Sequence, residues 1–315
     1  MQKYREPPMA DKAFKLSYLH PKYILSWLLV LLSWILASFP RSWQIGLAGW
    51  LAKHWSKGAN RRTRTIRQNI DLCFKGESQQ YRNDLVKANL KSSLLMMFDL
   101  VNMIWRQPKA LTEPVTVIGA EHLEKALQEN KPLLLVTGHF TSFIQSLTKL
   151  ASLTPYNAVY RRMDNPLLEA QFNQRAVSKH PMTLFHRKDI RNMLKKLADN
   201  GVVVIVPDQD FGISRGTFVN FFNIPTATIT SIPQYAQQTD AQVLLFSSYR
   251  DETGECTVTF EPSLSNYPSG DDVVDTQCWS DWLERSIKQH PADYLWMHKR
   301  FKTRPEGEKS FYSKH

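Results

Sequence analysis

The longest run of apolar residues lies near the start of the chain. Between Lys22 and Arg41 stand eighteen uncharged residues, YILSWLLVLLSWILASFP. A helix of that length rises roughly 27 Å, slightly less than the hydrocarbon core of a bilayer, which is about 30 Å thick. The segment lacks a small-residue cleavage site and has 22 residues ahead of it, unlike a cleaved signal peptide. The pattern predicts one transmembrane or membrane-anchoring helix at residues 22–40, preceded by a tail at residues 1–21.

The next stretch, residues 44–107, has the periodicity of helices. Its apolar residues recur near the 3.6-residue spacing that places them on one helix face. Examples are Leu47 with Leu51, Ile66 with Ile70, and the group Leu90, Leu94, Leu95, Phe98 and Val101. Pro108 is expected to end this helical stretch.

After Pro108, short apolar runs alternate with amphipathic segments. The predicted order is VTVIG, helical EHLEKAL, PLLLVTG, a helix from about Thr141, YNAVY, helical RNMLKKLADN, the buried strand GVVVIVP, TFVNFF, a helix from about Thr228, the strands QVLLFSSYR and CTVTFEP, and a helix near residues 279–289. This alternation is typical of an α/β domain. We predict one mixed central sheet flanked by helices, forming a single α/β domain at residues 41–315.

The composition and charge of the chain also predict that it binds an anionic partner. With 43% hydrophobic residues, 315 residues can fill a sizeable core. The formal net charge is +11, and residues 1–75 carry 13 Lys and Arg against Glu6, Asp11 and Asp71. Such a basic region around an apolar segment suits anionic lipid headgroups. No zinc-finger spacing or RNP-like sequence accompanies it, so we do not expect nucleic-acid binding.

Polar residues follow two of the predicted buried strands directly. PLLLVTG leads into His139, and GVVVIVP leads into Asp208 and Asp210. Because ligands of open α/β sheets bind beyond the carboxyl ends of strands, these residues are candidates for a site. A histidine there suits a general base, although a histidine at a strand end is more often structural.

The presence and absence of other motifs limit the kinds of binding site that the sequence supports. The sequence contains no GxGxxG, Walker A loop or HExxH, so dinucleotide, nucleotide and zincin sites lack their signatures. Three widely separated cysteines indicate neither a disulfide framework nor a CxxC metal pair, and the two aspartates have no third ligand of clear spacing. We therefore expect no metal or cofactor. Arg161 and Arg162, after the YNAVY run, are suited to a phosphate or an oxyanion.

Eight segments in order resemble the late acyltransferases of lipid A synthesis, within the lysophospholipid acyltransferase superfamily. They are LHPKY, NIDLCF, IGAEHL, GHF, YRRMDNPL, HRKDI, VPDQDFG and YLWMHKRFKTRPEG. The resemblance runs from about Tyr18 to Tyr312. It implies an enzyme of the cytoplasmic face of the inner membrane, which moves a fatty acyl chain from acyl carrier protein to a hydroxyl of a lipid A precursor.

The resemblance also implies roles for individual residues. His139 is the expected base, and Asp208 and Asp210 are the expected supporting acids. Arg161 is expected to hold an anion. The other candidate substrate-binding residues, taken from the matched segments, are Arg162, Asn165, Arg187 and Arg300.

One position departs from the family pattern. The family has Asp or Glu at the fifth position after its histidine, where this chain has Ile144. An orienting acid holds an imidazole in its useful tautomer, and isoleucine does not. Three explanations stay open: another acid, Asp99, Asp208 or Asp210, substitutes; the donor group is an aminoacyl (glycyl) group; or the protein is a weak or inactive relative that binds lipid. Gln145 is only a partial replacement because it is uncharged.

Overall fold

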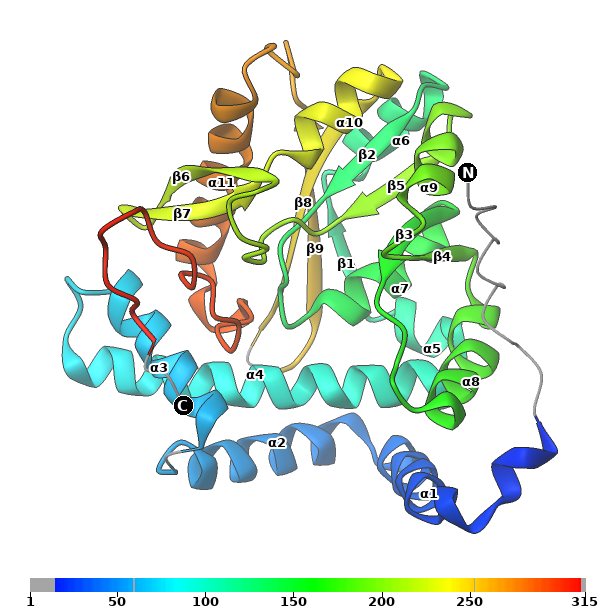
Figure 1. Cartoon of the computed structure of the whole chain (residues 1–315). Helices are drawn as coiled ribbons and strands as arrows, with labels where there is room; N and C mark the ends of the chain where they lie inside the picture. The colour runs from blue at the N-terminus through cyan, green and yellow to red at the C-terminus, as the bar shows by residue number, and fades with distance from the viewer. Residues whose placement is uncertain (1–14, 59, 252, 313–315) are drawn as a thin grey trace.

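Figure 1 shows the computed structural model, which describes residues 15–58, 60–251 and 253–312. These residues form a seven-stranded sheet in the order β1-β9-β8-β2-β5-β3-β4. The strands are β1 (Thr116–Ile118), β2 (Leu133–Val136), β3 (Tyr156–Tyr160), β4 (Met182–His186), β5 (Val202–Ile205), β8 (Gln242–Arg250) and β9 (Cys256–Ser263). All neighbours are parallel except β8 and β9, so the predicted mixed α/β architecture is confirmed.

The central strands β2 and β5 are buried on both faces. Leu134 and Val203 face one hydrophobic core, and Leu135 and Val204 face the other. Two covered faces explain why both strands are continuous apolar runs instead of alternating ones. Helices supply the cover; they are α5 (Pro108–Thr112), α6 (Ala120–Gln128), α7 (Phe143–Leu153), α8 (Pro166–Arg175), α9 (Ile190–Ala198), α10 (Ser231–Thr239) and α11 (Asp272–Gln289).

A separate hairpin stands beside the sheet, formed by β6 (Gly216–Phe221) and β7 (Ile224–Ile229). The predicted helix start at Thr228 was wrong, because Thr228 lies within β7 and α10 begins at Ser231. The connecting residues Phe222 and Asn223 both have positive φ, 53° and 59°. A two-residue turn of this kind usually contains glycine, so the hairpin had no obvious sequence signal. The strand β4 and the helix α8 were also not predicted.

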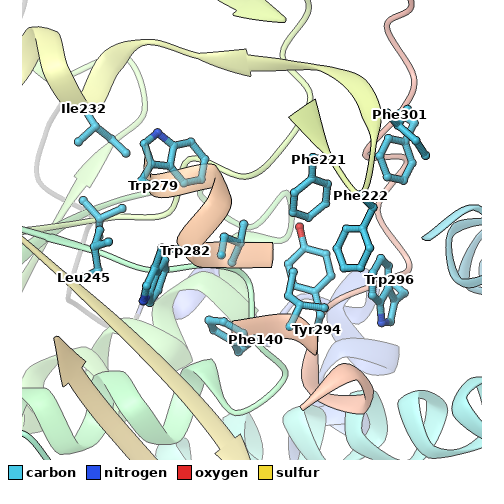
Figure 2. Packing of buried hydrophobic residues seen from close by; sticks show 14 of the residues in the cluster. Phe140, Phe221, Phe222, Ile232, Leu245, Trp279, Trp282, Tyr294, Trp296 and Phe301 are labelled. Atoms are coloured by element: carbon cyan, nitrogen blue, oxygen red, sulfur yellow. The ribbon is translucent and has the colours of Figure 1, made fainter. Parts of the chain in front are cut away.

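An aromatic cluster joins this hairpin to the C-terminal segment (Figure 2). Tyr294 lies between Phe221 and Trp296, with ring centroids 6.4 Å and 4.9 Å away. Trp279 of α11 is buried in the same core. Aromatic packing thus holds residues 294–301 against the body of the protein.

The predicted helical stretch 44–107 is three helices: α2 (Arg41–Trp55), α3 (Arg61–Cys73) and α4 (Gln79–Trp105). Pro108 begins α5 instead of ending the helical region outright. In Figure 1 the long helix α4 runs beneath the sheet, and α1 (Ile24–Ser38) and α2 lie on its far side. Residues 21–38 are long and apolar enough to cross a membrane, close to the predicted 22–40. Of the predicted tail, residues 1–14 lie outside the described residues.

Candidate active site

The site begins where β2 and β5 end side by side. The two strands pair in parallel, with Val136 opposite Ile205. His139 and Asp208 each follow three residues after their strand, so the two side chains emerge at the same edge of the sheet. His139 Nδ1 lies 2.5 Å from Asp208 Oδ1, and the His139 backbone N–H donates to Asp208 Oδ2 at 2.9 Å. The carboxylate therefore contacts the histidine twice.

Burial distinguishes the two partners. The Asp208 side chain is 1% exposed, whereas that of His139 is 23% exposed. Burial alone raises the pKa of Asp208, but the charge and hydrogen bonds of His139, with the charge of Arg300, outweigh it and hold that pKa below its usual range. An ionised Asp208 fixes the Nδ1–H tautomer, which leaves the Nε2 lone pair of His139 free to accept a proton.

Two further residues complete the site, and the sequence did not single them out. Gln209 Nε2 lies 3.0 Å from His139 Nε2 and 3.2 Å from His298 Nε2. Because an amide nitrogen only donates, both imidazoles accept from it. Burial and the neighbouring His139 lower the pKa of His298, which keeps it neutral near pH 7. Both residues lie in segments that carry the family resemblance, VPDQDFG and YLWMHKRFKTRPEG, but only the folded chain brings them together.

The backbone after β2 is clamped to residues 293–295. His139 O accepts from Leu295 N at 2.9 Å, and Thr141 N donates to Asp293 O at 2.6 Å. A Cβ on Gly138 would lie 2.5 Å from Leu283 Cδ1, so a larger residue before the histidine would force the Leu283 side chain to move. The imidazole is therefore held by its backbone as well as by Asp208.

Asp210 does not contact His139. Its carboxylate accepts from Gly212 N at 2.9 Å, and from Thr303 N and Thr303 Oγ1 at 2.6 Å and 2.8 Å. Asp210 thus ties the C-terminal segment to the loop after β5. Of the two expected supporting acids, Asp208 is the one that hydrogen-bonds His139, and the catalytic role of either stays a prediction.

Asp99 lies in a different, buried network. It pairs with Arg250, and with Arg41 at 2.9 Å. Arg250 in turn donates to Thr141 O at 2.5 Å and lies 3.8 Å from Asp293. No hydrogen bond joins Asp99 to His139 among the residues that the structure describes. Asp99 is therefore linked through Arg250 to the loop that carries His139, and not to the imidazole itself.

Ile144 lines a cavity of about 350 Å³. It is not a partner of His139. Arg41, Asp99, Arg106 and Gln145 line the same cavity. Gln145, considered above as a partial replacement for the acid, is bonded elsewhere, because its Oε1 accepts from Arg250 Nε at 3.0 Å. The position of the absent family acid thus adjoins the Arg250 network.

The arginines expected to bind substrate follow the parallel strands β3 and β4, at the same sheet edge as His139. Arg161 is 68% exposed and lies 3.4 Å from Asp164. Arg162 is half-buried, and Arg187 is exposed. Exposed guanidinium groups at this edge are suited to anionic ligands.

Asn165 and Arg300 have structural partners instead. Asn165 caps α8, accepting from Leu167 N and Leu168 N, and donates to Ser26 Oγ at 2.8 Å. Arg300 is 1% exposed and donates to Ala227 O and Thr228 Oγ1. Their polar groups hold α1, α8 and the hairpin in place, and their expected role in substrate binding stays a prediction.

Two other site classes receive no geometric support. Within the described ranges, no three His, Cys, Asp or Glu side chains are grouped to hold a metal ion. Residues 212–216, GISRG, have the GxSxG spacing of serine hydrolases. Ser214 nevertheless lies in an exposed turn before β6, whereas the nucleophile of such enzymes stands between a strand and a helix.

Comparisons with known proteins show the family of this chain. Residues 11–303 match the family described as bacterial lipid A biosynthesis acyltransferase. The chain is 32% identical to a lipid A biosynthesis lauroyltransferase of Escherichia coli (strain K12), over 95% of this chain and 98% of that protein. It is 27% identical to a palmitoleoyltransferase of the same strain, over 95% and 98%, and 23% identical to a myristoyltransferase, over 96% and 93%. The chain is therefore an acyltransferase that belongs to the bacterial lipid A biosynthesis acyltransferases.

Proposed function

We propose that the protein transfers a fatty acyl chain from acyl carrier protein to a hydroxyl of a lipid A precursor, with His139 as the general base. The observation that carries the proposal is the buried Asp208 on Nδ1 of a part-exposed His139. The relatives reported above are named as a lauroyltransferase, a palmitoleoyltransferase and a myristoyltransferase. A late acylation step of lipid A synthesis follows from this family membership.

The proposed reaction is a direct acyl transfer. His139 Nε2 removes the proton of the acceptor hydroxyl, and the hydroxyl oxygen attacks the carbonyl carbon of the thioester. The tetrahedral oxyanion collapses, the carbon–sulfur bond breaks, and the imidazolium returns the proton to the thiolate. The products are an ester and a free carrier thiol. Gln209, which occupies Nε2 here, gives way to the hydroxyl in this scheme.

Asp208 supplies what the family's acid supplies elsewhere. It orients the ring through Nδ1 and its negative charge stabilises the imidazolium. Its lowered pKa keeps it ionised at neutral pH. Of the explanations for Ile144, the geometry therefore favours a relocated acid, and favours Asp208 over Asp99 and Asp210.

The acceptor is proposed to bind through its anionic groups. Arg161 and Arg187 are exposed beyond β3 and β4, beside the strand that leads to Asp208. Guanidinium groups bind phosphate through paired hydrogen bonds, so these side chains suit a phosphorylated glycolipid. The body would face the cytoplasm at the inner membrane, where such a lipid keeps its acyl chains in the leaflet.

Mass spectrometry of lipid A tests the proposal. Cells that express the protein are expected to show one added long acyl chain, and cells with His139→Ala are expected to lack it. His122→Ala, a half-exposed histidine on α6, is the matched control and should leave the addition unchanged. A small nitrogen-containing addition would indicate aminoacyl transfer instead. Lipid binding without any mass change would indicate an inactive relative.

A further inference from the structure

The apolar helix α1 is fastened to the protein body along its length. Asn165 of α8 donates to Ser26 Oγ at 2.8 Å, and Trp105 of α4 donates to Ser33 Oγ at 2.8 Å. Arg106 donates to Ala37 O at 3.0 Å and to Phe39 O at 2.6 Å. From residue 26 to residue 37 these contacts cover roughly 16 Å of helix.

The contacts define a single stripe of α1. Ser26, Val30 and Ala37 are buried and Ser33 is half-buried, a spacing of four, three and four residues. Such spacing keeps the side chains on one helix face. Trp27 and Leu36 are half-buried. The other large hydrophobic residues of α1 are between 39% and 68% exposed; they are Ile24, Leu25, Leu28, Leu29, Leu31, Leu32, Trp34 and Ile35.

The neighbouring helix α2 has the same two-sided character. Gln44, Ala48 and Ala52 are buried on the side toward α4, where Gln44 exchanges two hydrogen bonds with Asn102. Three tryptophans of α2 are exposed; they are Trp43, Trp50 and Trp55. Both helices lie on the side of α4 opposite the sheet (Figure 1). We call the exposed apolar residues of these two helices the α1–α2 surface.

A spanning orientation of α1 conflicts with these contacts. The apolar helical segment at residues 21–38 is long enough to cross a membrane, so its contacts with the body decide the orientation. If α1 crossed the bilayer while bonded to Arg106 and Asn165, the charged Arg106 after α4 and the polar start of α8 would enter the hydrocarbon. Charged side chains are strongly disfavoured there.

Basic residues border the α1–α2 surface in sequence. Lys22 precedes α1, and the exposed residues after the middle of α2 include Lys53, Lys57, Arg61, Arg62 and Arg64. An amphipathic surface with cationic borders suits the interface of an anionic leaflet. We propose that α1 and α2 lie in the plane of one leaflet rich in anionic lipid, and that α1 does not cross the membrane. The proposal rests on the membrane location proposed above and adds its topology.

Cysteine labelling of the full chain tests the topology. The exposed native Cys278 reports the side on which the body lies. In a second chain, Ser17→Cys combined with Cys278→Ala reports the side of the segment before α1. Both are treated with a membrane-impermeant maleimide, in spheroplasts and in inverted inner-membrane vesicles. We expect both thiols to react only in inverted vesicles.

Each other result has a defined meaning. Reaction of position 17 only in spheroplasts, with Cys278 reacting only in inverted vesicles, would overturn the in-plane orientation. Reaction of both thiols only in spheroplasts would keep that orientation and overturn the cytoplasmic location. Loss of the protein from washed membranes would overturn docking itself. None of these results depends on acyl transfer, which the His139→Ala comparison tests separately.

A vesicle-binding assay tests the part played by α2. The purified full chain is floated with vesicles of phosphatidylethanolamine and phosphatidylglycerol. Trp43→Glu with Trp50→Glu is expected to weaken binding about tenfold or more, because both side chains would leave the apolar layer. Val273→Glu with Val274→Glu, two exposed apolar residues of α11, is the matched control and should bind like the unmodified chain. Equal binding of the tryptophan variant would overturn the role of α2.

Discussion

The Nδ1 atom of His139 and the Oδ1 atom of Asp208 lie 2.5 Å apart, and the same carboxylate accepts the His139 backbone N–H through Oδ2. This double contact orients the ring and its peptide together. Because Asp208 is buried while His139 is part-exposed, the pair presents only the Nε2 side of the imidazole to a substrate. The predictions below follow from this arrangement and from the network behind it.

Asp208→Asn is expected to lower kcat on the order of 10³ to 10⁴, the size of the effect when the orienting acid of a serine protease triad is replaced. The amide keeps the shape of the side chain but neither fixes the tautomer nor stabilises the imidazolium. Steady-state transfer from an acylated carrier measures this, with KM expected to change little. Asp210→Asn is the comparison variant. It should lower thermal stability, since Asp210 holds Thr303, and should lower kcat much less than Asp208→Asn does. Equal loss of kcat in both variants would contradict a special role for Asp208.

The lowered pKa of Asp208 predicts a pH dependence of stability. A carboxyl whose folded pKa lies below its unfolded value stabilises the fold above the unfolded pKa, about 3.9 for Asp, and that contribution is lost as pH falls through the folded pKa. The Tm of the unmodified chain should therefore exceed that of Asp208→Asn at pH 5. The difference should narrow below about pH 4. Thermal unfolding followed by circular dichroism measures this, and a difference that widens toward low pH would contradict the assignment.

Ile144→Glu is expected to leave kcat within about twofold of the unmodified enzyme. The Nδ1 atom of His139 already has a carboxylate partner, and position 144 lines the cavity beside Arg41 and Asp99. A second carboxylate there does not improve the orientation of the ring. The same transfer assay measures it, together with the double variant Ile144→Glu, Asp208→Asn. A gain of about tenfold, or recovery of activity in the double variant, would show that the missing family acid limits this enzyme.

Arg250→Met is expected to destabilise the fold by about 3–5 kcal/mol, because it leaves the buried carboxylates of Asp99 and Asp293 without their shared cation. Denaturant unfolding measures the change. Arg161→Met removes an exposed arginine paired with Asp164 and should cost no more than about 1 kcal/mol. A similar small cost in both variants would mean that the network behind His139 contributes little.

The local pattern of the sequence predicted the strands of the site well. β2 and β5 are continuous apolar runs because both of their faces are covered, and the polar residues that follow them mark the sheet edge. Residues 242–250 form the predicted strand β8, and the ordered family motifs predicted the chemistry of an acyltransferase. These features depend on neighbours in the chain or on covalent order, which the sequence contains directly.

The choice of partner for His139 was open in the sequence, which offered Asp208 and Asp210 as the expected supporting acids and Asp99 as an alternative. The order of strands in the sheet decided it. The chain leaves β2, builds β3 and β4 on the outer side, and returns to insert β5 beside β2, so Asp208 meets His139 while Asp210 turns to Thr303. Arg250, far along the chain, pairs with Asp99 and donates a hydrogen bond to Gln145. Sequence alone determined which groups stand at strand ends, whereas long-range pairing and the need to satisfy every buried charge determined which of them meet.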